Sequence, residues 1–425
     1  MAQINSLIEK LNGGDNPFFK ELYGTEKSVL KEQADRYIKY MNEFKSIYKS
    51  SDVSLFSSPG RTEVGGNHTD HQLGRVLAGA VNLDNIAVAA PNGTDKIRIT
   101  SVGFDPFEVD LNDLEITEFK VTPGNLVKAI ATGIKEIGLK VGGFDAVIHG
   151  CVPEGSGLSS SASIEVLIGA IFSHLFNDGK LDPVDNAKIG QKAEHACKKF
   201  CGLMDQTACA VGGFITIDFK DASNPIVKAI DFDFAHTGYS LVITNTGGSH
   251  GGLDEEYNAL PGEMKSVAKE LGHDVLRPLS MEKVVEAIPA IREKVGDRAL
   301  LRSIHFQAEN ARVVDEVAAL EAGNFNKFLQ LVIDSGFSSY MYNQNIYVGN
   351  DPAYQSVSLA LALSDLVLKG KGAWRVHGGG FAGTIQAFVP NDALHTYIST
   401  LEPVFGKGNC HVLFIRSKGA VKVEL

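Results

Sequence analysis

The chain has 425 residues, of which 44% are hydrophobic and 21% charged, a composition typical of globular proteins with room for two cores of usual domain size. Its formal net charge of −11 argues against a nucleic-acid partner or an anionic membrane surface, because both are bound through lysine and arginine. The sequence contains no run of about 18 apolar residues, and residues 1–5 do not resemble a signal peptide. We therefore expect a soluble, cytoplasmic protein.

The five cysteines are an odd and sparse set for a chain of this length, which predicts reduced thiols rather than a disulfide framework. Cys197, Cys201 and Cys209 lie close to His195, but this segment lacks the paired C-x2-C spacing of a structural zinc site. Buried or helix-facing cysteines are therefore favoured over a metal site.

The first part of the chain mixes helical and strand-like patterns. Apolar residues recur at mostly helical spacing over residues 26–47, which predicts an N-terminal helix. A short apolar segment at 53–56 precedes Ser57-Ser58-Pro59-Gly60, where proline and glycine in succession predict a turn, so the polar residues from Arg61 to His71 are expected on a loop. The patterns that follow are strand-like at 85–90, 97–102 and 107–111 and helix-like at 125–138 and 161–176.

The second part of the chain continues this mixture. The patterns there are strand-like at 239–245, 383–389 and 412–415 and helix-like at 261–271, 309–322 and 324–335. Strands and helices do not alternate as regularly as in a parallel βαβ array. The expected fold class is therefore α+β.

A serine- and glycine-rich segment over residues 153–162 leads directly into an apolar helix pattern. Small residues let the backbone approach an anion, and a helix N-terminus offers unpaired N–H groups and a favourable dipole. The serine hydroxyls can also provide oxygen ligands for the Mg²⁺ that accompanies ATP. A serine-rich helix cap without a ligand is the alternative, and spacing alone does not separate the two.

Residues 378–383, Gly-Gly-Gly-Phe-Ala-Gly, match the dinucleotide pattern G-x-G-x-x-G. The following residues 384–389 alternate like a strand, whereas a Rossmann site requires a helix there. We therefore reject an NAD site and expect a glycine turn within a hairpin. The Walker pattern and the protein-kinase and hydrolase motifs are absent from the sequence, so ATP would bind on another scaffold.

Two acidic residues eleven positions apart, Glu194 and Asp205, complete the set of candidate residues. Phosphoryl transfer needs a carboxylate for Mg²⁺ and a second group that orients or deprotonates the accepting hydroxyl. Glu194 and Asp205 can divide these tasks. Taken singly, each has an ordinary alternative, a solvated helix glutamate or a helix-capping aspartate.

Together these segments resemble the GHMP kinases, and within them the galactokinases. The family's first signature is similar to Pro59–Arg61 through His68–Asp70, its phosphate loop to residues 155–162, and its third motif to residues 378–383. Residues 202–206 are similar to the segment that carries the catalytic aspartate. The resemblance implies two mixed α/β domains, residues 1–215 and 216–425, with the active site in the cleft between them.

The resemblance implies an ATP-dependent sugar 1-kinase that acts on D-galactose. Asp205 matches the aspartate that takes the proton of the C1 hydroxyl or supports its loss electrostatically, and Arg61 matches the arginine that pairs with it. Ser161 and Glu194 match the Mg²⁺ ligands. The matches to sugar-binding positions are Asn67, His68, Asp70, Gly202, Asp205 and Tyr257. The matches to ATP-binding positions are Gly155, Ser156, Gly157, Leu158, Ser159, Ser160, Ser161, Gly379 and Gly380.

The sequence departs from the galactokinase pattern at position 67. Asn67 stands where galactokinases usually have a glutamate that accepts a hydrogen bond from the C6 hydroxyl, and Glu63 stands where they usually have asparagine. An asparagine amide can accept from a C6 hydroxyl or donate to a C6 carboxylate, so D-galactose and D-galacturonate both stay open as substrates.

Other departures are smaller. Ser249 replaces a basic residue that many members have before the histidine matching His250, and Glu194 lies one residue closer to Asp205 than is usual. A catalytically silent sugar-sensing relative is a further alternative, but Arg61, Asp205 and the phosphate loop are all present and disfavour it. We expect a monomer.

Overall fold

The structure, a computed structural model, describes residues 1–14, 16–153, 157–199, 201–248, 252–349 and 353–425. Within these ranges the larger of two sheets has nine strands, and all its pairs are antiparallel except β4 with β6. The central order is β1-β2-β3-β6-β4-β5, β13 pairs with β2, and β7 links β3 to β8. The strands are β1 (Ala2–Gln3), β2 (Asp52–Gly65), β3 (Arg75–Pro91), β4 (Lys96–Ser101), β5 (Phe107–Asp110), β6 (Phe144–Gly150), β7 (Phe214–Asp218), β8 (Ile226–Ile230) and β13 (Val421–Lys422).

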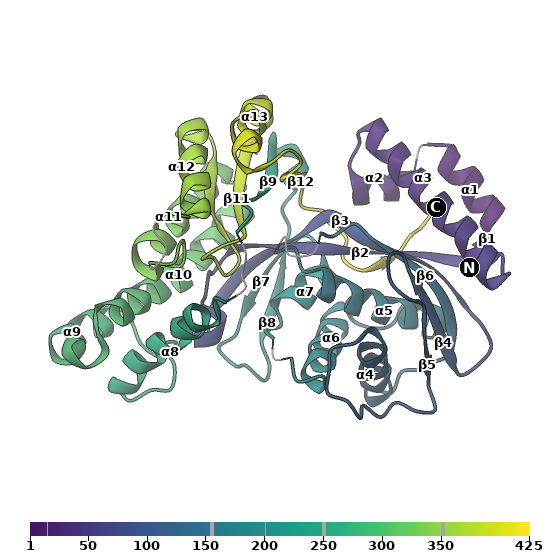
Figure 1. The fold of residues 1–425 in the computed structure, drawn as a ribbon, viewed down its shortest axis with the longest axis horizontal. Helices are drawn as coiled ribbons and strands as arrows, with labels where there is room; N and C mark the ends of the chain where they lie inside the picture. Colours follow the sequence, from purple (N-terminus) through teal and green to yellow (C-terminus); the bar gives the residue numbers. More distant parts are fainter. Residues whose placement is uncertain (15, 154–156, 200, 249–251, 350–352) are drawn as a thin grey trace.

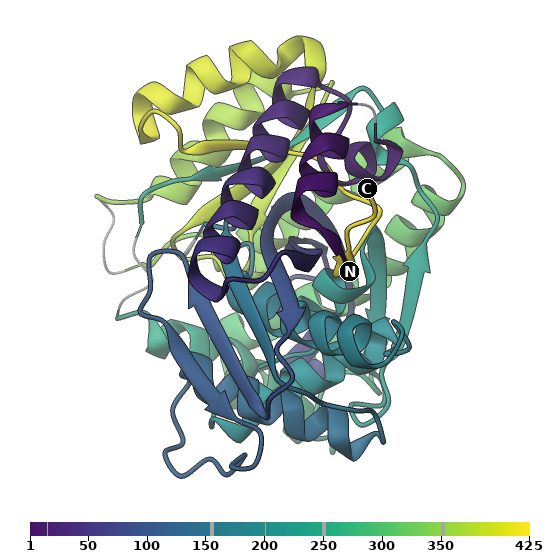
Figure 2. The same cartoon turned by 90° about the vertical axis from the view of Figure 1, so that its right-hand side faces the viewer.

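Helices cover both faces of the larger sheet (Figure 1). Alternate residues of β3 point to opposite faces, as a pleated strand requires. Ala87 and Ala89 pack against the helices below the sheet in Figure 1, whereas Ile86 and Val88 pack against the N-terminal helices, which lie in front in Figure 2. The N-terminal helices are α1 (Ile4–Asn12), α2 (Pro17–Tyr23) and α3 (Lys27–Tyr48), and the others are α4 (Pro123–Glu136), α5 (Ser160–Phe176), α6 (Pro183–Ala196) and α7 (Met204–Val211).

The second sheet is antiparallel, in the order β10-β11-β9-β12, and helices pack around it on the left of Figure 1. Its strands are β9 (Tyr239–Asn245), β10 (Ala373–His377), β11 (Thr384–Pro390) and β12 (Cys410–Leu413). The helices of this part are α8 (Asp254–Glu270), α9 (Met281–Val295), α10 (Asp297–Glu321), α11 (Phe325–Ser338), α12 (Ser356–Leu368) and α13 (Leu394–Phe405), with a π-helical turn at Ser339–Asn343.

The two sheets with their helices confirm the α+β class, and residues 378–383 join β10 to β11, which confirms the hairpin turn. The division at residues 215 and 216 stays a prediction; β7 spans that position. In the described ranges, none of the helices is both long and apolar enough to cross a membrane.

The prediction that a turn at Pro59–Gly60 places Arg61 on a loop was wrong, because β2 continues to Gly65. The strand passes the proline and glycine by a register shift between Pro59 and Arg61, and proline is tolerated in sheets at such irregularities. Gly60 is required there, since a Cβ atom would lie 2.7 Å from the Leu158 carbonyl oxygen. The polar residues at 61–65 are therefore held by a strand.

The end of β2 joins the second sheet through a buried polar seam. Gln386 Nε2 donates to Thr62 Oγ1 at 2.6 Å, His377 Nε2 lies 3.1 Å from the same oxygen, and the Arg375 guanidinium donates to the Val64 carbonyl. Burial, followed by the nearby positive charges, lowers the pKa of His377 to about 3, so its ring is neutral. These contacts fix β2 relative to β10 and β11.

Asp84 ties the N-terminal helices and the C-terminal segment to the larger sheet. The carboxylate is 1% exposed and accepts from Arg36 at 2.6 Å, from the Tyr23 hydroxyl at 2.7 Å, from Arg416 at 3.4 Å and from the Ser57 hydroxyl. Burial alone would raise the pKa of Asp84, but the two arginines outweigh it and hold the pKa below its usual range.

We predict that Asp84→Asn lowers the free energy of unfolding at pH 7 by about 3–5 kcal/mol, because two buried arginines lose their counterion. Because the pKa of Asp84 is lowered in the folded protein, its contribution to the free energy of unfolding is present above about pH 4 and is lost as the pH falls further. The difference in the free energy of unfolding between the wild type and the variant should therefore become smaller in acid. Urea unfolding across this pH range measures both effects. A loss below about 1 kcal/mol at pH 7 would contradict the role of Asp84.

Candidate active site

A bidentate ion pair between Arg61 on β2 and Asp205 in the first turn of α7 lies at the centre of the site. Arg61 Nε donates to Asp205 Oδ1 at 2.8 Å, and the terminal NH2 donates to Oδ2 at 2.7 Å. The Ser159 hydroxyl also donates to Asp205, and the other terminal nitrogen of Arg61 donates to the Gly157 carbonyl. Such paired, charge-assisted bonds fix both side chains in one geometry.

The Asp205 carboxylate is held in its ionised form. Burial alone would raise its pKa, but the charge and hydrogen bonds of Arg61 and the hydrogen bond from Ser159 outweigh burial and keep the pKa of Asp205 below its usual range. The side chain keeps 33% of its surface exposed, so a ligand can reach it. The pair can therefore bind a hydroxyl group and stabilise negative charge that develops on its oxygen.

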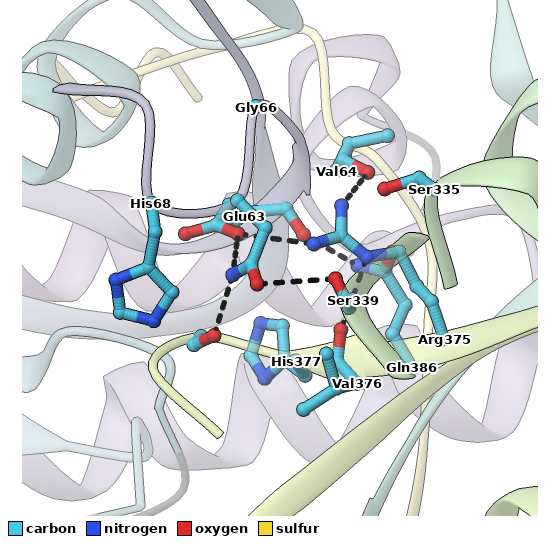
Figure 3. Close-up of polar contacts among 12 residues, drawn as sticks. Glu63, Val64, Gly66, His68, Ser335, Ser339, Arg375, Val376, His377 and Gln386 are labelled. Atoms are coloured by element: carbon cyan, nitrogen blue, oxygen red, sulfur yellow. Dashed lines mark hydrogen bonds and ion pairs between the residues drawn. The ribbon is translucent and has the colours of Figure 1, made fainter. Parts of the chain in front are cut away.

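Asn67 lies just beyond the end of β2, and protein groups surround its side chain. Its amide donates to Glu63 Oε1 at 2.9 Å and to the Gly378 carbonyl at 2.8 Å. Its oxygen accepts from Asn345 Nδ2 at 2.9 Å and from the Ser339 hydroxyl at 3.2 Å. Figure 3 shows Glu63 and Ser339 among these contacts. Asn67 is 1% exposed, and its predicted sugar contact stays a prediction.

The Asn67 backbone is also bound by α10. His305 Nε2 donates to the Asn67 carbonyl at 2.9 Å, and the Asn67 N–H donates to Glu309 Oε1 at 3.4 Å. Burial alone would raise the pKa of Glu309, but Arg312 and His305 outweigh it and lower the pKa to about 2. Residue 67 is thus held from both its backbone and its side chain.

The glycine turn at residues 378–380 faces the predicted sugar-binding residues. Its three carbonyls accept, in order, from Asn67 Nδ2 at 2.8 Å, His68 Nε2 at 2.9 Å and the Tyr257 hydroxyl at 2.7 Å. Glycine is required at position 380, since a Cβ atom would lie 1.9 Å from the Asn345 carbonyl oxygen. The turn therefore orients these side chains, and the predicted ATP role of Gly379 and Gly380 stays a prediction.

Asp70 and Gly202 complete this side of the site. A Cβ atom on Gly202 would lie 3.2 Å from Asp70 Oδ2, so the turn after β2 approaches the segment before α7. Asp70 is exposed and therefore accessible to a ligand. The structure thus brings Asp70 and Gly202 together just before α7, and His68 and Tyr257 together at the glycine turn.

A cavity of about 780 Å³ opens beside the N-terminus of α5. Residues 157–161 of the predicted phosphate loop line one end, where the first turn of α5 leaves backbone N–H groups without partners in the helix. The rest of the lining is mostly apolar and includes Ile99, Phe104, Leu126 and Ile130, but it also contains the acidic residues Asp105 and Glu165. An apolar cavity that ends at a helix N-terminus suits a flat base carrying an anionic group. Gly155 and Ser156 lie outside the described residues.

Of the predicted metal ligands, Ser161 lies in the first turn of α5 and Glu194 in the last turn of α6. Glu165 follows Ser161 by one helical turn, so the two share a face of α5. Burial, and then the neighbouring Glu194 carboxylate, raise the pKa of Glu165. Glu194 is 2% exposed and paired with the Lys199 ammonium.

The side-chain oxygens of Ser161, Glu165 and Glu194 are ligands suited to a hard divalent cation. Buried Glu165 Oε1 accepts no hydrogen bond from an N–H or O–H donor of the described residues, and hydroxyl and carboxylate oxygens are the ligands that Mg²⁺ prefers. Within the described ranges, no three His, Cys, Asp and Glu side chains form a metal cluster. A metal ion would therefore share these few donors with water and phosphate oxygens.

Several residues of the site were not found from the sequence. Lys199 gave no signal beyond its charge, and the apolar cavity wall comes from β4, α4 and the loop after β4, which carry no motif. Ser339 and Asn345, which bind Asn67, lie more than 270 residues away in the chain.

Two family models match the chain. The model of the GHMP kinases N terminal domain matches residues 125–213, and the galactokinase galactose-binding signature matches residues 42–91. The first range contains residues 157–161 and Asp205, and the second contains Arg61 and the turn after β2.

Known proteins show the same relationship. The chain is 33% identical over 362 residues to a galactokinase of Clostridium tetani, which covers 84% of this chain and 88% of that protein. It superposes on Lactococcus lactis galactokinase complexed with galactose with a TM-score of 0.73 and 25% identity, covering 90% of this chain and 98% of that one. Methanococcus jannaschii mevalonate kinase, with a TM-score of 0.60, 16% identity and coverage of 86% and 98%, shares the fold.

We predict that Asn67→Asp lowers the free energy of unfolding by about 3–5 kcal/mol, because a second buried carboxylate would face Glu63 and the Gly378 carbonyl. Urea unfolding at pH 7 measures the loss. Adding Glu63→Gln should recover part of it, since the glutamine amide can donate to the introduced carboxylate. Equal stabilities of the single and double variants would contradict this arrangement.

Proposed function

The chain belongs to the galactokinase family of GHMP kinases, and we propose that it transfers the γ-phosphoryl group of ATP to the C1 hydroxyl of D-galactose. The observation that carries this proposal is the Arg61–Asp205 ion pair, which lies between the cavity at α5 and the side chains around the glycine turn. One side of the pair suits a nucleotide and the other a polar sugar.

The chemistry follows from this pair. The C1 hydroxyl binds at Asp205, its oxygen forms a bond to the γ-phosphorus, and the bond from that phosphorus to the bridging oxygen breaks to release ADP. The hydroxyl proton passes to the Asp205 carboxylate and then to water. Because Arg61 keeps the pKa of Asp205 low, the carboxylate acts mainly by orienting the hydroxyl and by taking its proton late, as phosphate bonding acidifies it.

We propose that Ser161 and Glu194 hold the Mg²⁺ that accompanies ATP. Bound there, the ion would neutralise charge on the phosphates. The Lys199 ammonium would then move away from Glu194 or turn toward the phosphates, because the Glu194 carboxylate cannot bind Mg²⁺ and pair with Lys199 equally well at the same time. The Ser161 hydroxyl in the first turn of α5 and the buried Glu194 carboxylate support this assignment.

The adenine and ribose are proposed to occupy the 780 Å³ cavity, with the phosphates at residues 157–161. Its size lies within the usual range for such ligands, roughly 300–1,000 Å³. Phe104 is 64% exposed at this cavity, and exposed aromatic rings commonly stack on bases. A monomeric state and a cytoplasmic location stay predictions.

We predict that Asp205→Asn lowers kcat by at least about 10³-fold, because the amide neither takes the hydroxyl proton nor pairs fully with Arg61. Galactose binding should be retained within a few-fold. ADP release measures the rate, and calorimetry measures binding. Asp297→Asn, an exposed carboxylate at the start of α10 that does not line the cavity, is the control. Turnover by Asp205→Asn near the wild-type rate would remove Asp205 from its role.

We predict that Phe104→Ala raises the KM for ATP about fivefold, as expected for losing a stacking contact worth about 1 kcal/mol. The KM for galactose should stay unchanged, because Phe104 lines only the nucleotide cavity. Phe337→Ala removes a similarly exposed ring on α11 and serves as the control. Equal changes in both KM values would place the nucleotide elsewhere.

A further inference from the structure

Asn67 has no hydrogen-bonding capacity left for a ligand. An asparagine amide has two donors and an oxygen with two lone pairs. All four are used, by Glu63, Gly378, Ser339 and Asn345, at distances from 2.8 to 3.2 Å. A sugar contact would have to break one of these buried bonds, and an unpaired buried polar group is costly.

Glu63, in contrast, has one carboxylate oxygen that is not used. Oε1 accepts from Asn67 Nδ2 at 2.9 Å and from Arg375 at 3.2 Å. Oε2 accepts no hydrogen bond from the residues that the structure describes, and it is not among their buried unpartnered atoms. The side chain keeps 12% of its surface exposed, so this oxygen is open to the solvent of the site.

Arg375 explains how a carboxylate persists at this enclosed position. Its side chain is fully buried, and it donates to the Val64 and Val376 carbonyls as well as to Glu63. The guanidinium thus compensates the charge of Glu63 through Oε1 only. Oε2 therefore stays available as a charged hydrogen-bond acceptor, while Arg375 balances the charge of the carboxylate.

The position of Glu63 on β2 sets what it can reach. Arg61 and Glu63 pair with Ala80 and Ala78 of β3 without a register shift between them, so their side chains leave the same face of the strand. Two residues of strand separate their backbones by about 7 Å. In Figure 3 the Glu63 side chain lies between His68 and Arg375. A pyranose with its C1 hydroxyl at Asp205 is long enough to reach Glu63 if it lies along this face of β2.

We propose that Glu63 is a specificity-determining residue, whose Oε2 accepts a hydrogen bond from the hydroxyl at C4 or C6, at the end of the hexose opposite C1. Asn67 then acts as a positioning residue that holds Glu63. The carboxylate repels a sugar with a carboxylate at C6, so the site selects galactose over galacturonate. This inference rests on the proposed function.

The test compares the wild type with Glu63→Gln by ADP release. The substituted glutamine keeps a carbonyl for Asn67 and Arg375 but places an NH2 group where Oε2 was. The KM for galactose should rise about 10- to 100-fold, the effect of losing a charged hydrogen bond, while kcat changes less than about threefold. Glu270→Gln, an exposed carboxylate on α8, is the matched control and should change neither value.

Analogues identify the partner hydroxyl. For one of the two sugars 4-deoxygalactose and 6-deoxygalactose, the KM should be the same in the wild type and in Glu63→Gln, because that sugar lacks the hydroxyl that Glu63 binds; for the other, the KM should rise in Glu63→Gln as it does for galactose. Galacturonate should be turned over poorly by the wild type and better, relative to galactose, by Glu63→Gln. A KM increase of the same factor for galactose and both deoxy sugars, or no increase at all, overturns the proposal.

Failure of the proposed function and failure of the proposed role of Glu63 give different results. A wild type that does not phosphorylate galactose refutes the proposed function, whereas galactose turnover with an unchanged KM in Glu63→Gln refutes only the role of Glu63. If Glu63→Gln does not fold, Glu63→Asp provides the same test, because its shorter carboxylate withdraws from the sugar. For Glu63→Asp, as for Glu63→Gln, the KM should rise for galactose but not for the deoxy sugar that lacks the hydroxyl bound by Glu63. Equal KM changes for galactose and both deoxy sugars would overturn the proposal.

Discussion

The Arg61–Asp205 ion pair is the interaction on which the arrangement of the site depends. It joins β2 to α7, and the added bonds to Ser159 and Gly157 bring in the loop before α5. Because a bidentate pair tolerates little displacement, these three segments must keep one relative position. The cavity, the glycine turn and the Asn67 contacts are all arranged around that position.

The strand β2 makes this geometry possible because it lies in the larger sheet and also contacts the second one. It pairs with β3 along most of its length and carries core residues between the sheet and the helices, while Thr62 and Val64 also form hydrogen bonds to β10 and β11. A residue on such a strand has less freedom than one on a loop. Arg61 and Glu63 are thereby fixed on a strand that contacts both sheets.

The sequence predicted the fold class, the family and about half of the helices and strands in the described ranges, because periodicity and short motifs are local. It failed at β2, where Pro59 and Gly60 indicated a turn but a bulge and the approach of Leu158 keep the strand continuous. It also could not show that Asn67 is saturated, since Ser339, Asn345 and Gly378 are distant in the chain. Asn67 occupies the position of the family's usual glutamate, whereas the carboxylate with an unused oxygen belongs to Glu63.

In this protein, whose net charge is −11, three cations of the site are each paired with a carboxylate. Arg61, Lys199 and Arg375 each pair with one carboxylate, on Asp205, Glu194 and Glu63. The cations are therefore held in place before a ligand arrives, and little reorganisation is needed when phosphate charge develops nearby. These three ion pairs therefore offer no excess positive charge to an anionic ligand. Under the proposed function, a metal ion that accompanies ATP would supply further positive charge, and the Glu194–Lys199 pair is the one that it would open.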